Sequence, residues 1–218
     1  MRISLIGPGD VEFHYQNLLK IDKLRFEFEL EGIAKVLAES NSQLVLLPDK
    51  GVSLNVARIY REKKGKNVIG AVPLSDMTFG IKHLEPYIKM KLNEKPFFDY
   101  FINTDNWFKH DLIKGLLGDV LVCLGDSPGT NGELNYAVYL YKLLSGRKEG
   151  IEIAGKHIHP ELRAGKNFTI LVYSPFLISK KLSKEQEEYI KNFGINLVYI
   201  SSSTQLKQEL ENLKNKIK

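Results

Sequence analysis

The 218-residue sequence lacks several features that would settle its class at once. It has a single cysteine, Cys123, so neither an intrachain disulfide nor a metal site built from cysteines can form, and we expect a reducing compartment. No apolar run approaches the roughly 20 residues that a membrane helix needs. No signal peptide is evident, because the first strand-like residues lead directly into Gly7-Pro8-Gly9-Asp10. We therefore expect a cytoplasmic protein that does not enter a membrane.

A strong excess of one charge is also missing. The chain carries 31 basic and 26 acidic residues, a net charge of +5, and its one tight basic cluster is Lys63, Lys64 and Lys66. Aromatic and basic residues are not interleaved along one face, as binders of single-stranded nucleic acids require. The composition indicates a solvated, lysine-rich surface without a strong nucleic-acid signature.

What the sequence does contain is a repeated succession of apolar run, glycine-containing loop and helix-like segment. We predict strands at residues 3–6, 44–47, 68–73, 121–124, 168–173 and 197–200, and helices at 23–39, 54–63, 103–117, from 131 onward, 184–193 and 206–217. Residues 11–22 are expected to be an irregular insertion, and 151–159 a short ribbon. Such repeats imply right-handed parallel crossovers, and hence a Rossmann-like, doubly wound α/β fold with a mostly parallel sheet and helices on both faces. The length suits a single domain, with residues 145–218 as its C-terminal extension.

The stretch from Val120 to Val138 is the most informative part of the chain. Its short apolar run is followed by dense turn chemistry and then by a helix for which Asn131 is a suitable N-cap. Strand, loop and helix N-terminus direct several backbone N–H groups at one spot, which suits a phosphate or a carboxylate. Glu133 is expected in the first helical turn. It either compensates the helix dipole or is directed at the ligand.

Two earlier loops follow strands in the same way. Gly7-Pro8-Gly9-Asp10 ends the first strand, and Lys50-Gly51-Val52-Ser53 follows the second, with Ser53 as a candidate N-cap. Ligands of doubly wound sheets bind beyond the carboxyl ends of the strands, so we expect the three loops to line one cleft. The candidate ligand-binding residues are Gly7, Pro8, Gly9, Asp10, Gly51, Ser53, Ser127, Gly129 and Thr130. In the insertion, His14 and Tyr15 could cover the ligand.

Two further groups of residues have less specific interpretations. Tyr87, Phe97, Phe98, Tyr100 and Phe101 are predicted to form either a cover over the pocket or a dimer contact, because exposed aromatics usually mark interfaces. His157 and His159 would share one face of a strand, but no third ligand is near, so a polar strand face is favoured. We expect neither a metal ion nor a cofactor.

Taken together, these residues resemble the Lonely-Guy family of phosphoribohydrolases. Its members release a base from a nucleoside monophosphate, are often misnamed lysine decarboxylases, and share a nucleotide-binding superfamily with the DNA-processing protein A. The features that carry the resemblance are the first glycine loop, Gly51-Val52-Ser53, Val68-Ile69-Gly70-Ala71-Val72-Pro73, Asp119 and the loop that ends in Gly129-Thr130-x-x-Glu133. They cover residues 1–144 and imply a small-molecule nucleotide as ligand and a homodimer.

The family motif Pro-Gly-Gly-x-Gly-Thr-x-x-Glu is matched in part. Gly129, Thr130 and Glu133 agree with it, whereas Gly125-Asp126-Ser127-Pro128 occupies its first four positions. An Asp126 carboxylate would repel a phosphate dianion unless it points away. Fifteen positions before the motif, where the family has an arginine that works with the glutamate, this chain has His110, with Lys109 beside it.

The resemblance implies two functions. In the first, which the altered motif favours, the loops bind a nucleotide or a nucleotide derivative without turnover, as a ligand-sensing module. In the alternative, the protein hydrolyses the N-glycosidic bond of a nucleoside monophosphate. Gly129 and Thr130 would then hold the phosphate or ribose, Glu133 would orient or deprotonate water, and His110 would stabilise the departing base or the phosphate.

Overall fold

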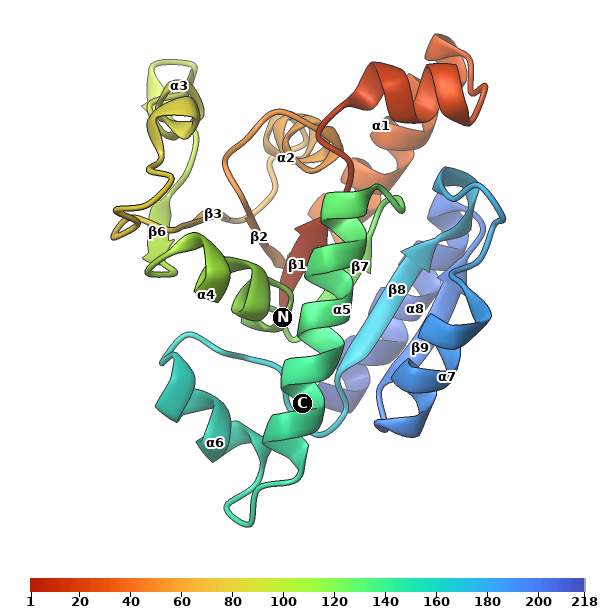
Figure 1. The fold of residues 1–218 in the computed structure, drawn as a ribbon. Helices are drawn as coiled ribbons and strands as arrows, with labels where there is room; N and C mark the ends of the chain where they lie inside the picture. Colours follow the sequence, from red (N-terminus) through yellow and green to blue (C-terminus); the bar gives the residue numbers. More distant parts are fainter. Residues whose placement is uncertain (218) are drawn as a thin grey trace.

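The computed structural model describes residues 1–217, and the side chain of Ile217 lies outside what it describes. A central sheet runs through the molecule with helices on both sides (Figure 1). Among residues 1–217, no helix is long and apolar enough to cross a membrane.

Seven parallel strands form the sheet, in the order β6-β3-β2-β1-β7-β8-β9. Their bounds are β1 Arg2–Ile6, β2 Gln43–Leu46, β3 Val68–Val72, β6 Tyr100–Asn103, β7 Val120–Cys123, β8 Thr169–Tyr173 and β9 Asn196–Ile200; β4 Lys91–Leu92 and β5 Lys95–Pro96 form a separate antiparallel pair. The chain proceeds outward from β1 to β6 and then returns to β7 on the other side of β1. The strand order therefore reverses between β1 and β7, which is where doubly wound sheets bind their ligands. The predicted Rossmann-like fold is confirmed.

Helices cover both faces of this sheet (Figure 1). They are the π-helix η1 Glu12–Leu18, α1 Lys23–Glu39, α2 Val52–Glu62, η2 Lys82–Leu84, α3 Glu85–Ile88, α4 Trp107–Ile113, η3 Lys114–Leu117, α5 Pro128–Ser145, α6 Ile151–Ile158, η4 Ser174–Phe176, α7 Lys184–Asn192 and α8 Ser203–Ile217. One apolar core joins α1, α2 and α8 to the sheet, and a second joins α4, α5, α6 and α7 to the opposite face. Both faces of β1, β3, β7 and β8 are buried, which explains why these strands are continuous apolar runs.

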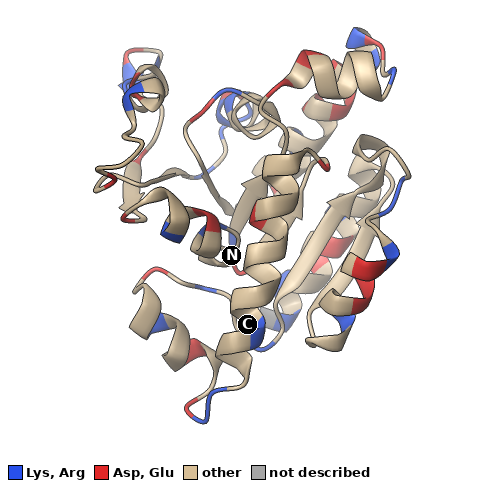
Figure 2. Ribbon diagram, in the orientation of Figure 1, with Lys and Arg blue, Asp and Glu red and all other residues tan. Residues whose placement is uncertain are grey.

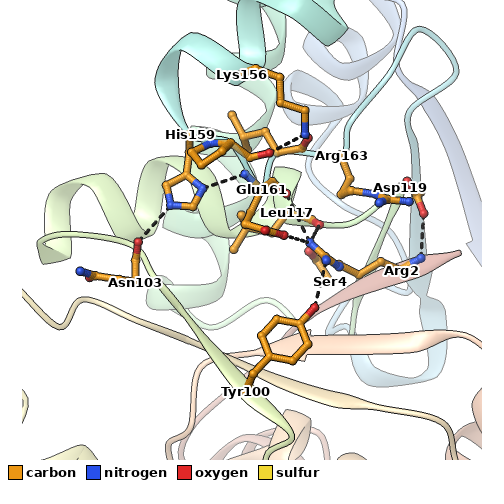
Figure 3. Close-up of polar contacts among 12 residues, drawn as sticks. Arg2, Ser4, Tyr100, Asn103, Leu117, Asp119, Lys156, His159, Glu161 and Arg163 are labelled. Carbon is orange, nitrogen blue, oxygen red and sulfur yellow. Dashed lines mark hydrogen bonds and ion pairs between the residues drawn. The ribbon is translucent and has the colours of Figure 1, made fainter.

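A polar network closes the sheet at the amino ends of its strands (Figure 3). The Arg2 guanidinium donates to the Glu161 carboxylate at 3.0 Å and to the Tyr100 hydroxyl at 3.1 Å. The Asp119 carboxylate accepts from the Arg2 amide at 2.7 Å and from the Arg163 side chain at 3.1 Å. The network links β1 to the edge strand β6 and to the segment that follows α6. The glycine loops lie at the opposite end of the sheet, beyond the carboxyl ends of the strands.

Two of the helices beside those loops begin earlier than predicted. Ser127, not Asn131, is the N-cap of α5, and Pro128 occupies the first helical position, where its fixed φ and missing N–H cause no loss. Helix α2 follows Gly51 directly, so Ser53 lies in the first turn and is not the N-cap. Serine followed by proline was the stronger start signal for α5.

The segment before β7 also differs from its prediction. Residues 100–103 form the edge strand β6, which the sequence reasoning had missed, and α4 begins only at Trp107. Its N-cap is Asn106, which accepts from the Lys109 amide at 3.0 Å. Asp105 has a φ of +74°, a left-handed conformation that separates the strand from the helix.

Two segments predicted as irregular or extended are helical. Residues 12–18 form the π-helix η1, and residues 151–158 form α6, where Ile151, Ala154 and Gly155 are buried at helical spacing. His157 and His159 therefore do not share a strand face. The imidazole of His159 instead contacts the Asn103 carbonyl at 3.0 Å (Figure 3).

The aromatic cluster belongs mainly to the core, which corrects the premise that it is exposed. Phe97 and Phe98 are buried, with their rings edge to face at 5.0 Å. Phe101 packs against Phe98 and lies over Gly70, where a Cβ would be only 2.5 Å from the Phe101 ring. Phe97, Phe98 and Phe101 complete one of the two apolar layers and do not line the cavity, whereas Tyr100 is 38% exposed, so a dimer contact of the cluster stays a prediction.

Candidate functional site

A cavity of about 140 Å³ lies beyond the carboxyl ends of β1, β2 and β7. It is lined by Gly7, Gly9, Leu47, Asp49, Lys50, Gly51, Ser53, Lys114, Ser127, Gly129, Thr130 and Glu133. The predicted convergence of the three glycine loops is therefore confirmed. That these residues bind a ligand stays a prediction.

The first two loops pack tightly enough to require glycine. A Cβ at Gly7 would lie 2.3 Å from a methyl group of Val52, and one at Gly51, whose φ is +134°, would lie 2.7 Å from the Pro8 carbonyl. The Val52 amide donates to that carbonyl at 3.1 Å. Gly129 is different, because no atom would lie within 4 Å of a Cβ built there. The backbone of α5 is thus open to the cavity at Gly129.

The N-terminus of α5 has the properties of an anion site. The Ser127 hydroxyl accepts from the Thr130 amide, and the Ser127 carbonyl accepts from the Asn131 amide at 2.8 Å. Within the described residues, the Gly129 amide has no acceptor. The positive end of an 18-residue helix therefore presents a free donor at the cavity wall.

Two side chains from the β2–α2 loop and the first turn of α2 also line the cavity. The Oγ atom of Ser53 is buried and has no hydrogen-bond partner among the described residues. Lys50, which is exposed, also lines the cavity and carries a cationic side chain. A buried hydroxyl without a partner is costly, so this one is well suited to bind an acceptor on a ligand.

A buried ion pair forms another part of the wall. The Nζ atom of Lys114 lies 2.6 Å from Oε1 of Glu133, and the two side chains are 5% and 14% exposed. Because α5 begins at Pro128, Glu133 is in the second turn and not in the first, so dipole compensation no longer accounts for it. Sequence reasoning missed Lys114 as a site residue. The available signal was its position one helical turn after His110.

His110 is placed differently from the arginine of the resemblance. It is fully buried, its Nδ1 lies 2.9 Å from the Thr104 hydroxyl, and it is not part of the cavity wall. Burial, and secondarily the charge of Lys114, hold the pKa of His110 well below its usual value, so the imidazole is neutral near pH 7. Lys114, and not His110, is the cation that contacts Glu133.

Asp111 is a second carboxyl group close to this pair. Burial and the nearby Glu133 charge raise the pKa of Asp111. Potential ligand atoms of His110, Asp111 and Glu133 lie within 4.8 Å of one another, a donor set that a divalent cation could use. The Lys114 ammonium already supplies a positive charge next to the Glu133 carboxylate.

Two of the predicted ligand-binding residues, Pro8 and Asp10, do not line the cavity. Pro8 is buried beneath the loops, and the Asp10 carboxylate accepts from the Phe13 amide at the start of η1. Asp126 points away from the cavity, with Oδ1 3.5 Å from Nε2 of His14. His14 and Tyr15 are buried and do not cover the cavity, which corrects that prediction.

The chain is similar in fold to solved structures of known proteins. No protein-family model and no curated protein sequence matches the chain. Among solved structures, a molybdenum cofactor binding protein from Rippkaea orientalis is 15% identical with a TM-score of 0.54, and the match covers 98% of this chain and 96% of that one. The Moco carrier protein from Chlamydomonas reinhardtii is 18% identical with a TM-score of 0.55, covering 99% and 98%. The chain shares their fold. At this identity, the comparison carries no ligand or activity to this chain, and the Lonely-Guy resemblance stays a prediction.

Proposed function

We propose that this protein binds a nucleotide or nucleotide derivative by its phosphate group, as a ligand-sensing module. The observation that carries the proposal is one cavity lined by Gly129, Ser53 and Lys50, which offer the free Gly129 amide, the unpaired Ser53 hydroxyl and a cationic side chain. These donors belong to three chemical types, and all of them bind phosphate oxygens well. Their position at the reversal of strand order is also where doubly wound folds hold phosphates.

The size of the cavity limits how much of the ligand it encloses. Pockets that bury a whole drug-sized molecule are roughly 300–1,000 Å³, whereas this cavity measures about 140 Å³. We therefore place the phosphate and part of the ribose inside, with the base outside the enclosed part.

Hydrolysis of the N-glycosidic bond is the second candidate function. It is favoured by the position of Glu133, whose carboxylate lines the cavity together with Gly129 and Thr130. To act as a base, Glu133 must accept a water molecule in addition to, or in place of, the Lys114 ammonium at 2.6 Å. Lys114 would then supply the cation that the family obtains from arginine.

The molybdenum cofactor is a second ligand to test in the binding function. It appears in the names of two proteins that share the fold over nearly their whole length. The assay below therefore includes it next to the nucleotides.

We also infer a homodimer, on a different surface from the aromatic cluster. Only two of the 18 residues of α5 are charged, and both are engaged: Glu133 with Lys114, and Lys142 over the Phe193 ring. Figure 2 shows the helix almost free of charge. Tyr139 is exposed on it, beside a groove of about 630 Å³ between α5 and α7. We call the exposed side of α5 at Tyr139 the ridge. Because the ridge and the groove lie on one face, a twofold axis can pair this face with the same face of a second copy.

The binding proposal is tested by thermal shift and by measurement of base release. A panel of nucleoside 5′-monophosphates and the molybdenum cofactor is added to wild type, Ser53→Ala and the exposed control Ser179→Ala. We expect one nucleotide to raise the melting temperature, and Ser53→Ala to weaken its binding by up to about 10-fold, the value of one hydrogen bond. Without ligand, Ser179→Ala should melt at the wild-type temperature, and Ser53→Ala at the same or a higher temperature, because it removes a buried hydroxyl that has no partner. If no nucleotide stabilises wild type, the proposal is wrong.

A further inference from the structure

The loop between β7 and α5 rests on the π-helix η1. The Tyr15 hydroxyl donates to the Leu124 carbonyl, and Nε2 of His14 lies 3.3 Å from the Phe176 carbonyl and 3.5 Å from Oδ1 of Asp126. A Cβ at Gly125 would be 3.1 Å from that same Nε2. Leu124 and Asp126 are therefore in contact with Tyr15 and His14, and a side chain at Gly125 between them would come close to His14.

Asp126 poses an electrostatic problem at this position. It immediately precedes Ser127, the N-cap of α5, so its carboxylate is one residue away from the amides that would bind an anion. A carboxylate is itself a favourable acceptor for a helix N-terminus and would compete with a ligand phosphate there. Yet its Oδ1 is buried without a hydrogen bond and lies outside the cavity.

A favourable contact must hold the carboxylate in this position, because burying it without a partner is costly. The one basic side chain within ion-pair distance of Asp126 among the described residues is that of His14. His14 is itself held by its contact with Phe176 and by edge-to-face packing on the Tyr15 ring at 4.8 Å.

We propose that His14 is a positioning residue that holds the Asp126 carboxylate on the η1 side of the loop and so keeps the N-terminus of α5 free for an anionic ligand. This inference rests on the proposed function. Without His14, the carboxylate turns toward the N-terminus of α5, where the Gly129 amide is free, and competes with the phosphate. His14 thus acts through Asp126 and does not touch the ligand.

The test is a double-mutant cycle with His14→Leu, Asp126→Asn and the double variant. Binding of adenosine 5′-monophosphate and of inorganic phosphate is measured by calorimetry. We expect His14→Leu to weaken binding by about 10-fold or more, because an uncompensated like charge enters the site. Asp126→Asn should bind at least as tightly as wild type. The double variant should return to within about 2-fold of Asp126→Asn, since neutral asparagine no longer repels the anion.

A purely structural role for His14 gives a different result, namely a double variant as weak as His14→Leu, and this result would overturn the inference. His14→Gln, which keeps a side-chain N–H donor, should bind like wild type. His14→Asn, whose shorter amide does not reach Asp126, replaces His14→Leu if the leucine variant fails to fold.

A readout without ligand separates this inference from the proposed function. Crystal structures of wild type and His14→Leu are compared for the orientation of the Asp126 side chain. We expect the carboxylate beside His14 in wild type and turned toward the Gly129 amide at the N-terminus of α5 in the variant. An unchanged orientation refutes the positioning role, even if nucleotides bind. If neither probe binds wild type, the proposed function fails, while the structures still decide the role of His14.

Discussion

Lys114 and Glu133, which are 19 residues apart in the chain, meet at 2.6 Å in the wall of the cavity. The contact joins the segment before β7 to the second turn of α5, so the ion pair lies beside the α5 N-terminus, where we propose that a phosphate binds. A buried pair of this kind contributes little net stability, but the loss of one partner leaves an uncompensated charge. The pair is therefore the natural starting point for mutagenesis.

Replacing Lys114 with Ala should destabilise the fold. Glu133 and the neighbouring Asp111 would then face each other without a cation, and breaking a buried pair in this way costs about 3 kcal/mol or more. Urea unfolding at pH 7 measures the change. The double variant Lys114→Met/Glu133→Leu, which removes both charges, should lose clearly less. A loss below about 0.5 kcal/mol for Lys114→Ala would mean that the pair is solvated and unimportant for stability.

The variant Glu133→Gln separates the two candidate functions. Glutamine keeps the size and much of the hydrogen bonding but removes the charge. If Glu133 is catalytic, nucleotide binding should persist while base release falls by ~10²-fold or more. Affinity, base release and melting temperature are measured together, with the exposed Glu185→Gln as the matched control. Unchanged affinity and base release would refute a catalytic role for Glu133, and a wild type that releases no base from any nucleotide would refute the hydrolase.

His110 should make the stability depend on pH. Its pKa is depressed in the folded protein, so below pH 6.5 the unfolded chain binds more protons at this residue than the folded one. Stability is therefore full above pH 6.5 and decreases as the pH falls toward the folded pKa. His110→Asn should show a smaller decrease between about pH 7.5 and pH 5.5 in urea unfolding. The exposed control His157→Asn should behave like wild type, and equal slopes for all three proteins would contradict the assignment.

Light scattering tests the homodimer. At micromolar concentration we expect twice the 24.9 kDa of one chain. Tyr139→Glu places a charge on the exposed ridge of α5 and should give the monomer mass, because an unpaired charge in an apolar interface is strongly unfavourable. Ile153→Glu, at an equally exposed position on α6, is the control and should stay dimeric. If wild type has the mass of a single chain, the homodimer proposal is wrong.

The sequence alone determined the features that depend on local pattern. Continuous apolar runs identified six of the seven strands of the main sheet, and the bounds predicted for α1, residues 23–39, are those observed. The glycine loops were located because turn chemistry and strand ends are properties of neighbouring residues. Since parallel strands end at one edge of the sheet, the convergence of the three loops also followed from the sequence.

Only the tertiary structure decided which side chains meet. The spacing of the family motif pointed to His110. In the folded chain, η3 packs against α5 and brings the Lys114 side chain, one helical turn further on, to Glu133. Likewise, no local pattern indicates that Asp126 turns toward a histidine 112 residues earlier, or that Phe97 and Phe98 are buried under the edge of the sheet. The direction of a side chain depends on contacts between distant segments, and those contacts form only when the chain is folded.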